Sequence, residues 1–93
     1  MTAPVRRGFV VSGRVQGVAF RAFTRDAAAT HGVTGFVANH ADGTVRGECQ
    51  GEPGSVAAFL EAVRGGSPWS RVDAVELLEL TAAPDEIGFT VRR

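Results

Sequence analysis

Cysteine and long apolar runs are scarce in this 93-residue sequence, which has one cysteine, Cys49, and no apolar run of transmembrane length. A single cysteine cannot form an intramolecular disulfide, which agrees with a reducing compartment. The first residues, MTAPVRRG, also lack the apolar core of a secretory signal. Together with the short length, these absences predict one domain over residues 1–93, located in the cytoplasm and without a membrane partner.

The sequence also lacks lysine and net charge, since all ten basic residues are arginines and ten acidic residues balance them. A net charge of zero argues against a general nucleic-acid or membrane binder. The arginines are unevenly placed, because five precede the first acid, Asp26: Arg6, Arg7, Arg14, Arg21 and Arg25. Such a local positive field suits a small anionic ligand better than a polyanion, and arginine binds phosphate oxygens in a bidentate fork.

Apolar periodicity predicts five strands, at residues 8–12, 34–40, 44–50, 72–80 and 89–92. The dipeptide Asp42-Gly43 is typical of a two-residue hairpin turn. One predicted helix ends at Gly32, and a second begins at Pro53. Their apolar positions recur at helical spacing: Phe20, Phe23, Thr24, Ala27 and Ala28 in the first helix, and Val56, Phe59, Leu60 and Val63 in the second.

The order of these elements predicts the fold class. Each helix has a single apolar face, so both must cover one side of an antiparallel sheet to bury it. The expected fold is therefore an α+β, ferredoxin-like two-layer sandwich, βαββαβ with a short extra C-terminal strand.

The stretch from Ser12 to Arg21, SGRVQGVAFR, reads as a loop between the first strand and the first helix. Gly13 and Gly17 permit unusual backbone conformations, and a helix start can direct several N–H groups at one anion. Arg14 and Arg21 flank the loop, and an anion would relieve the unfavourable position of Arg21 in the first helical turn. We interpret the loop as a phosphate cradle, with a plain structural turn as the alternative.

Asn39, at the end of the second predicted strand, shares a face with the apolar Val37. A polar amide there needs a hydrogen-bond partner, which is either the hairpin backbone or a bound water. The neighbouring His40 is expected to point away from it. Cys49 is interpreted as a small core residue rather than a nucleophile, and no spacing of His, Cys, Asp or Glu predicts a metal site.

Two motifs carry a resemblance to the acylphosphatase family. SGRVQGVAFR resembles the first signature of that family, and GFVANHADGTVRGECQG resembles the second. The helix PGSVAAFLEAVRGG, the segment SRVDAV and the closing GFTVRR extend the similarity over nearly the whole chain.

The resemblance implies an enzyme that hydrolyses small acyl phosphates to a carboxylate and inorganic phosphate without metal or cofactor. Nothing in the sequence demands more than a monomer. It implies that Arg21 binds the phosphate and that Asn39 orients the attacking water. The phosphate cradle would be formed by the loop backbone, at Gly13, Arg14, Val15, Gln16, Gly17 and Val18. The departures from the family pattern, at Ala19, Phe36 and Ala38, bear on substrate preference.

Two alternatives stay open at the level of sequence. Ferredoxin-like sandwiches also serve as RNA-binding modules, although the third predicted strand offers no aromatic side chain for base stacking. The fold could also be a piece of a larger carbamoyl-transfer protein. A free-standing enzyme, without nucleic acid as a partner, is the simpler expectation because the sequence begins with Met1.

Overall fold

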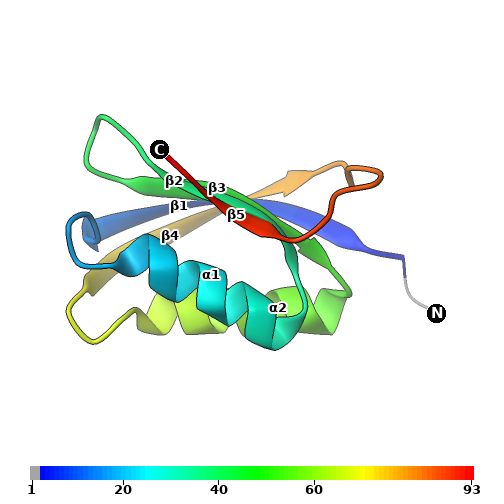
Figure 1. Ribbon diagram of the computed structural model, residues 1–93, viewed down its shortest axis with the longest axis horizontal. Helices are drawn as coiled ribbons and strands as arrows, with labels where there is room; N and C mark the ends of the chain where they lie inside the picture. The colour runs from blue at the N-terminus through cyan, green and yellow to red at the C-terminus, as the bar shows by residue number, and fades with distance from the viewer. Residues whose placement is uncertain (1–2) are drawn as a thin grey trace.

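A five-stranded sheet with two helices packed on one face makes up residues 3–93, the part of the chain described in this computed structural model (Figure 1). The elements, in chain order, are β1 (Val5–Arg14), α1 (Phe20–His31), β2 (Thr34–Asn39), β3 (Val45–Gly51), α2 (Pro53–Gly65), β4 (Arg71–Leu80) and β5 (Phe89–Arg92). The strands lie side by side in the order β4-β1-β3-β2-β5. This arrangement confirms the predicted ferredoxin-like sandwich.

The direction of β5 differs from the predicted antiparallel sheet. Strands β1 to β4 pair antiparallel, whereas β5 pairs parallel with β2, with Val37 opposite Val91. The connection over residues 81–88 carries the chain from β4 at one edge to the opposite edge. Because no tight hairpin joins β5 to its neighbour, the turn does not impose an antiparallel direction. The sheet is therefore mixed.

The core lies between the sheet and the helices. On the strands, alternate residues such as Phe9, Val11 and Val37 are buried. The helix predictions are confirmed, because α2 buries all four of its predicted apolar positions and α1 buries Phe20, Thr24, Ala27 and Ala28. The rings of Phe9 and Phe59 meet edge to face, with centroids 5.9 Å apart.

The connection between β2 and β3 is longer than the two-residue turn predicted from Asp42-Gly43. It covers residues 40–44 and is closed by a hydrogen bond from the His40 N–H to the Thr44 carbonyl. The Asp42 carboxylate explains the difference, since it accepts hydrogen bonds from the N–H and hydroxyl of Thr44 and from Arg46. Gly43 still takes a left-handed conformation, at φ 92°.

The first strand extends two residues beyond its predicted end, so that Gly13 and Arg14 belong to β1 and not to the loop. The pairing of β1 with β4 shifts register between Ser12 and Gly13, as at a β-bulge. Gly13 has φ 125°, and a Cβ there would collide with the Arg71 carbonyl. This position therefore requires glycine, and the bend directs the chain into the loop before α1.

Within residues 3–93, no helix has the length and apolar character needed to cross a membrane.

Candidate active site

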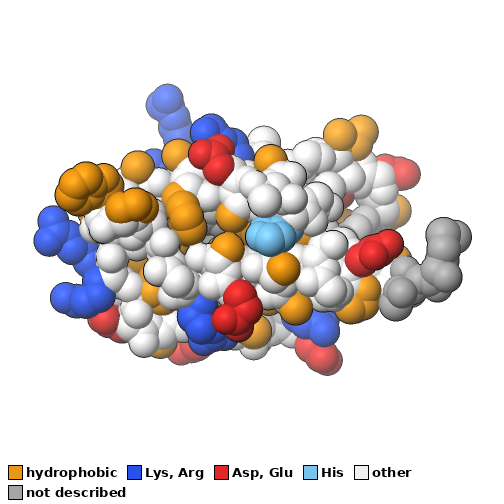
Figure 2. Space-filling view, turned by 90° about the horizontal axis from the view of Figure 1, so that it is seen from below, with side chains coloured by type: hydrophobic (Ala, Val, Ile, Leu, Met, Phe, Trp, Pro, Cys, Tyr) orange, Lys and Arg blue, Asp and Glu red, His pale blue; other side chains and the backbone are white. Residues whose placement is uncertain are grey.

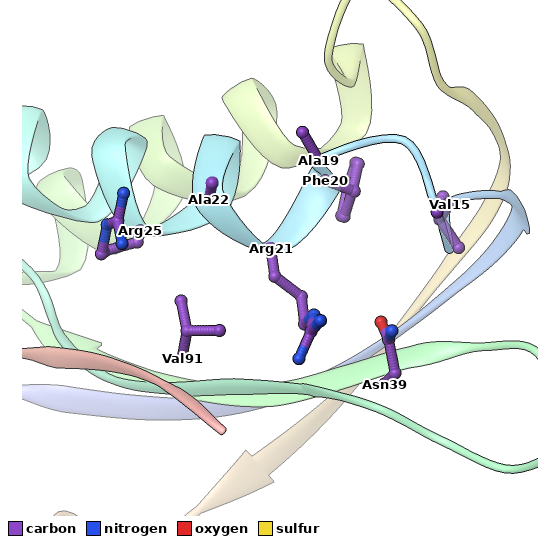
Figure 3. A pocket seen from close by; sticks show the side chains of 9 residues that line it. Val15, Ala19, Phe20, Arg21, Ala22, Arg25, Asn39 and Val91 are labelled. Carbon is purple, nitrogen blue, oxygen red and sulfur yellow. The ribbon is translucent and has the colours of Figure 1, made fainter. Parts of the chain in front are cut away.

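A cavity of about 220 Å³ lies where the loop after β1, the first turns of α1, the end of β2 and β5 converge (Figure 3). Four of the predicted site residues line it: Val15, Gly17, Arg21 and Asn39. These residues are up to 24 positions apart in sequence, and the fold brings them together because β2 lies beside β5 and beneath α1. A cavity of this size holds a small molecule only.

Arg21 extends from the first turn of α1 into this cavity (Figure 3). Its Nη1 donates a hydrogen bond of 2.8 Å to the backbone carbonyl of Arg92 in β5. Among residues 3–93 the guanidinium makes no ion pair. The side chain is thus held in place by one backbone contact while its charge stays available to an anion.

Asn39 points into the same cavity from the last position of β2, on the face that Gly35 and Val37 share. Its Oδ1 is buried, yet it accepts no hydrogen bond from any described residue. A buried acceptor without a partner costs free energy, so its retention at this place calls for a ligand or water. The alternative that Asn39 satisfies the hairpin backbone finds no support in these contacts.

The loop and helix start present unpaired backbone donors. None of the N–H groups from Gln16 to Ala22 donates to another described residue; the first such hydrogen bond runs from Phe23 to the Ala19 carbonyl. No side chain caps α1, and its first turn holds no acid. Ala19 begins the helix with left-handed angles, φ 59° and ψ 24°. Free N–H groups at a helix N-terminus form a site suited to an anion.

The side chain of Gln16 connects this loop to the β2–β3 connection. Its Nε2 donates to the carbonyls of His40, at 2.7 Å, and Thr44, at 3.0 Å. Both acceptors lie within five residues of Asn39 along the chain. Gln16 therefore couples the position of the loop to that of Asn39 through its side chain.

The remaining predicted cradle residues do not line the cavity. Arg14 is exposed at the end of β1, opposite Arg71 of β4. Val18 packs against the hydrophobic core. Gly13 lies at the β-bulge of β1, which directs the chain into the loop.

Five lining residues were not among the site residues predicted from the sequence: Ala19, Phe20, Ala22, Arg25 and Val91. Arg25 follows Arg21 by four positions and so shares its helix face, a spacing that could have identified it. Val91 could not have been found in this way, because only the placement of β5 beside β2 brings it to α1.

The other reactive side chains lie elsewhere. His40 is exposed, with its Nδ1 3.3 Å from Asp42, and lines none of the cavity. Cys49 is fully buried in the core, and burial raises the pKa of its thiol to about 12. The prediction that Cys49 is a core residue is confirmed.

The sheet face opposite the helices does not resemble an RNA-binding surface. Its aromatic residue, Phe36, is covered by the guanidinium of Arg92, 3.7 Å from the ring centroid. On the helix face, acidic and basic side chains are interspersed and do not gather into one basic field (Figure 2). Among residues 3–93, the open sheet face therefore lacks the row of free aromatic side chains that base stacking needs.

Comparison with known proteins identifies similar sequences and structures. The acylphosphatase family model matches residues 7–91. An acylphosphatase from Anaeromyxobacter dehalogenans is 44% identical over 92 residues, covering 99% of both chains. The crystal structure of acylphosphatase from Bacillus subtilis superposes with a TM-score of 0.91 at 32% identity, covering 96% of this chain and 99% of that one.

The same fold also occurs inside a larger protein. The crystal structure of full-length HypF, in a phosphate- and nucleotide-bound form, matches with a TM-score of 0.87 at 25% identity. The match covers 100% of this chain and only 12% of the HypF chain.

Proposed function

The chain belongs to the acylphosphatase family, hydrolases that act on acyl phosphates, and we propose that it does so with Arg21, Asn39 and the loop backbone as its catalytic site. One observation carries this proposal. A row of unpaired N–H groups, a cation without an ion pair and a buried acceptor without a partner all surround one small cavity. A bound acyl phosphate would supply acceptor oxygens for the N–H groups and a negative charge for the cation, and a water would supply a donor for the buried acceptor.

The phosphoryl group binds at the start of α1. Its oxygens accept hydrogen bonds from the free N–H groups after Val15 and from the Arg21 guanidinium, since both lie around the cavity. The positive end of the helix dipole adds to their attraction. In a loose phosphoryl-transfer transition state, charge spreads over the equatorial oxygens, so the same groups lower the barrier.

Asn39 orients the attacking water. Its unpartnered Oδ1 accepts a hydrogen bond from the water and aims the lone pair at phosphorus. The new P–O bond forms as the bond from phosphorus to the carboxyl oxygen breaks. A phosphate oxygen takes the proton of the water, because a loose transition state makes little demand for a strong base.

The leaving group explains why so few side chains suffice. A carboxylate has a low pKa and departs without being protonated, so the reaction needs no general acid. His40 and Cys49, which lie away from the cavity, are not required in this scheme.

We further propose that residues 1–93 form one domain that works as a cytoplasmic monomer. The two helices and five strands enclose one hydrophobic core, and the match to the Anaeromyxobacter acylphosphatase covers 99% of both sequences. The free thiol of Cys49 suits a reducing compartment.

Two variants separate the roles of the catalytic side chains. We expect Arg21→Ala to lose both phosphate binding and turnover, and Asn39→Ala to keep phosphate binding while losing about a hundredfold in kcat. Titration with inorganic phosphate and steady-state hydrolysis of benzoyl phosphate measure the two properties. Full activity of Asn39→Ala would contradict the water-orienting role.

A further inference from the structure

A second arginine lies at the far end of the cavity. Arg25 and Arg21 are both lining residues, and their spacing of four places them on one face of α1 about 6 Å apart along the helix axis. Figure 3 shows Val91 between the two side chains. Arg21 lies near the middle of the cavity, beside Asn39, and an apolar wall formed by Ala22 and Val91 separates it from Arg25.

Arg25 has little to neutralise its charge. No acidic residue lines the cavity. The nearest acid is its neighbour Asp26, whose Oδ1 is 3.5 Å from the Arg25 Nε, and both side chains are at least half exposed. An exposed pair of this kind contributes little, so Arg25 can turn to a ligand at small cost.

We propose that Arg25 selects acyl phosphates whose acyl group carries a second negative charge at its far end. This inference rests on the proposed function, which places the phosphoryl group at Arg21. With that end held, an acyl chain of three or four carbons is comparable in length with the rise of about 6 Å that separates the two arginines along α1. Its methylene groups contact Ala22 and Val91, and its distal carboxylate pairs with the guanidinium. The favoured substrates are monoacyl phosphates of short dicarboxylic acids.

A long apolar acyl chain is the competing occupant. A second hollow begins at Arg25 and follows α1 and β5 past Ala29 and Phe89. Arg25 borders both hollows, so an apolar chain would have to pass a guanidinium to continue between them. Placing a charge against apolar groups is unfavourable, and the short anionic acyl group avoids this contact.

The test compares succinyl phosphate with butyryl phosphate, which have the same number of carbons but differ in the distal carboxylate. We expect the parent protein to favour succinyl phosphate in kcat/KM. We expect Arg25→Gln to reduce the ratio of kcat/KM for succinyl phosphate to kcat/KM for butyryl phosphate about threefold to fivefold, because one half-exposed charge pair is lost. The change should appear in KM and not in kcat. Because the ratio is internal to each protein, a change in the folded fraction cancels.

Arg64→Gln is the matched control. It removes one positive charge from the surface of α2, where Arg64 has a weak ion pair with Glu61 similar to that of Arg25 with Asp26, and it should leave the ratio unchanged. Arg25→Lys should retain part of the selectivity. Raising the salt concentration should reduce the ratio of the parent protein, since the pair is exposed to solvent.

An unchanged ratio in Arg25→Gln would overturn the proposal. So would a preference of the parent protein for octanoyl phosphate over both four-carbon substrates, which would place an apolar chain in the second hollow. Arg21→Ala serves as a separate check in the same assays. If it hydrolysed both substrates at the parent rate, the proposed placement of the phosphoryl group at Arg21 would fail.

Discussion

The side-chain amide of Gln16 donates a hydrogen bond of 2.7 Å to the backbone carbonyl of His40, the residue that follows Asn39. A second hydrogen bond, of 3.0 Å, reaches the Thr44 carbonyl across the same connection. The loop that begins the proposed phosphate site and the strand end that carries Asn39 are separate elements of the fold. Gln16 joins them, so the water and the phosphoryl group can be held in one fixed geometry.

Replacing Gln16 with alanine should therefore impair catalysis more than folding. Loss of the two hydrogen bonds costs about 1–2 kcal/mol of stability. A displacement of about 1 Å between Asn39 and the loop would lower kcat roughly tenfold to a hundredfold. Steady-state hydrolysis of benzoyl phosphate and urea unfolding measure the two effects.

Gln50→Ala is the control for Gln16→Ala. Gln50 also links two segments, exchanging hydrogen bonds with the N–H and carbonyl of Ala83 and accepting one from Arg6, but it lies away from the cavity. Its loss should reduce stability by at least as much as the loss of Gln16 and leave kcat within about twofold. Equal effects of the two variants on kcat would show that Gln16 acts through stability alone.

Ala19 is a position where a glycine should stabilise the protein. Its left-handed backbone, at φ 59°, costs an alanine roughly 1 kcal/mol, and glycine removes that strain but adds freedom to the unfolded chain. Ala19→Gly should raise the free energy of unfolding by about 0.5–1 kcal/mol in urea titrations. Ala29→Gly, the same change at an exposed helical position, should lower it by about 1 kcal/mol. Changes of the same sign would contradict the strain.

The sequence predicted the parts of the fold that depend on local pattern. The four apolar positions of α2 and the inward face of Asn39 follow directly from periods of 3.6 and two. The direction of β5 could not be predicted, because it depends on the path of residues 81–88 across the end of the sheet. The length of the β2–β3 connection depended on side-chain hydrogen bonds of Asp42, which a dipeptide rule does not include.

The placement of Arg21 and Asn39 at one site could be predicted, but the outline of the cavity that both line could not. Arg21 and Asn39 belong to motifs in which residue type and spacing carry the information. Val91 enters the cavity only because β5 pairs with β2, a contact between segments more than 50 residues apart. The hydrogen bond from Gln16 to His40 likewise depends on how the loop meets the hairpin.

Cys49 should resist thiol reagents in the folded protein. Its side chain is completely buried between the sheet and the helices, and burial raises the pKa of the thiol to about 12. Reaction with Ellman's reagent at pH 8 should be at least about a hundredfold slower than in urea-unfolded protein. Rapid labelling of the native protein would show that the core opens readily around β3.

Arg6 is a buried charged residue that binds the connection between β4 and β5 through Glu86. It is 5% exposed, and it donates hydrogen bonds to both carboxylate oxygens of Glu86 and to Glu48. Thr34 also donates to Glu86, at 2.8 Å. This network fastens the 81–88 connection to the sheet, and thereby fixes the start of β5.

Acid should weaken the protein through Glu86. Hydrogen bonds from Arg6 and then Thr34 hold the pKa of Glu86 below its ordinary value of 4.5 in the folded state. Its contribution is therefore complete above the unfolded pKa and is lost as the pH falls through the lowered folded value. At pH 7, Glu86→Gln should lower the free energy of unfolding in urea by about 2 kcal/mol, and this difference from the parent protein should shrink below about pH 4.5.

Glu79→Gln is the control, since it removes an exposed carboxylate 3.8 Å from Arg7. It should lower the free energy of unfolding by less than about 0.5 kcal/mol at both pH 7 and pH 3. If the Glu86→Gln difference were as large at pH 3 as at pH 7, the ion pair with Arg6 would not be the source of the stability.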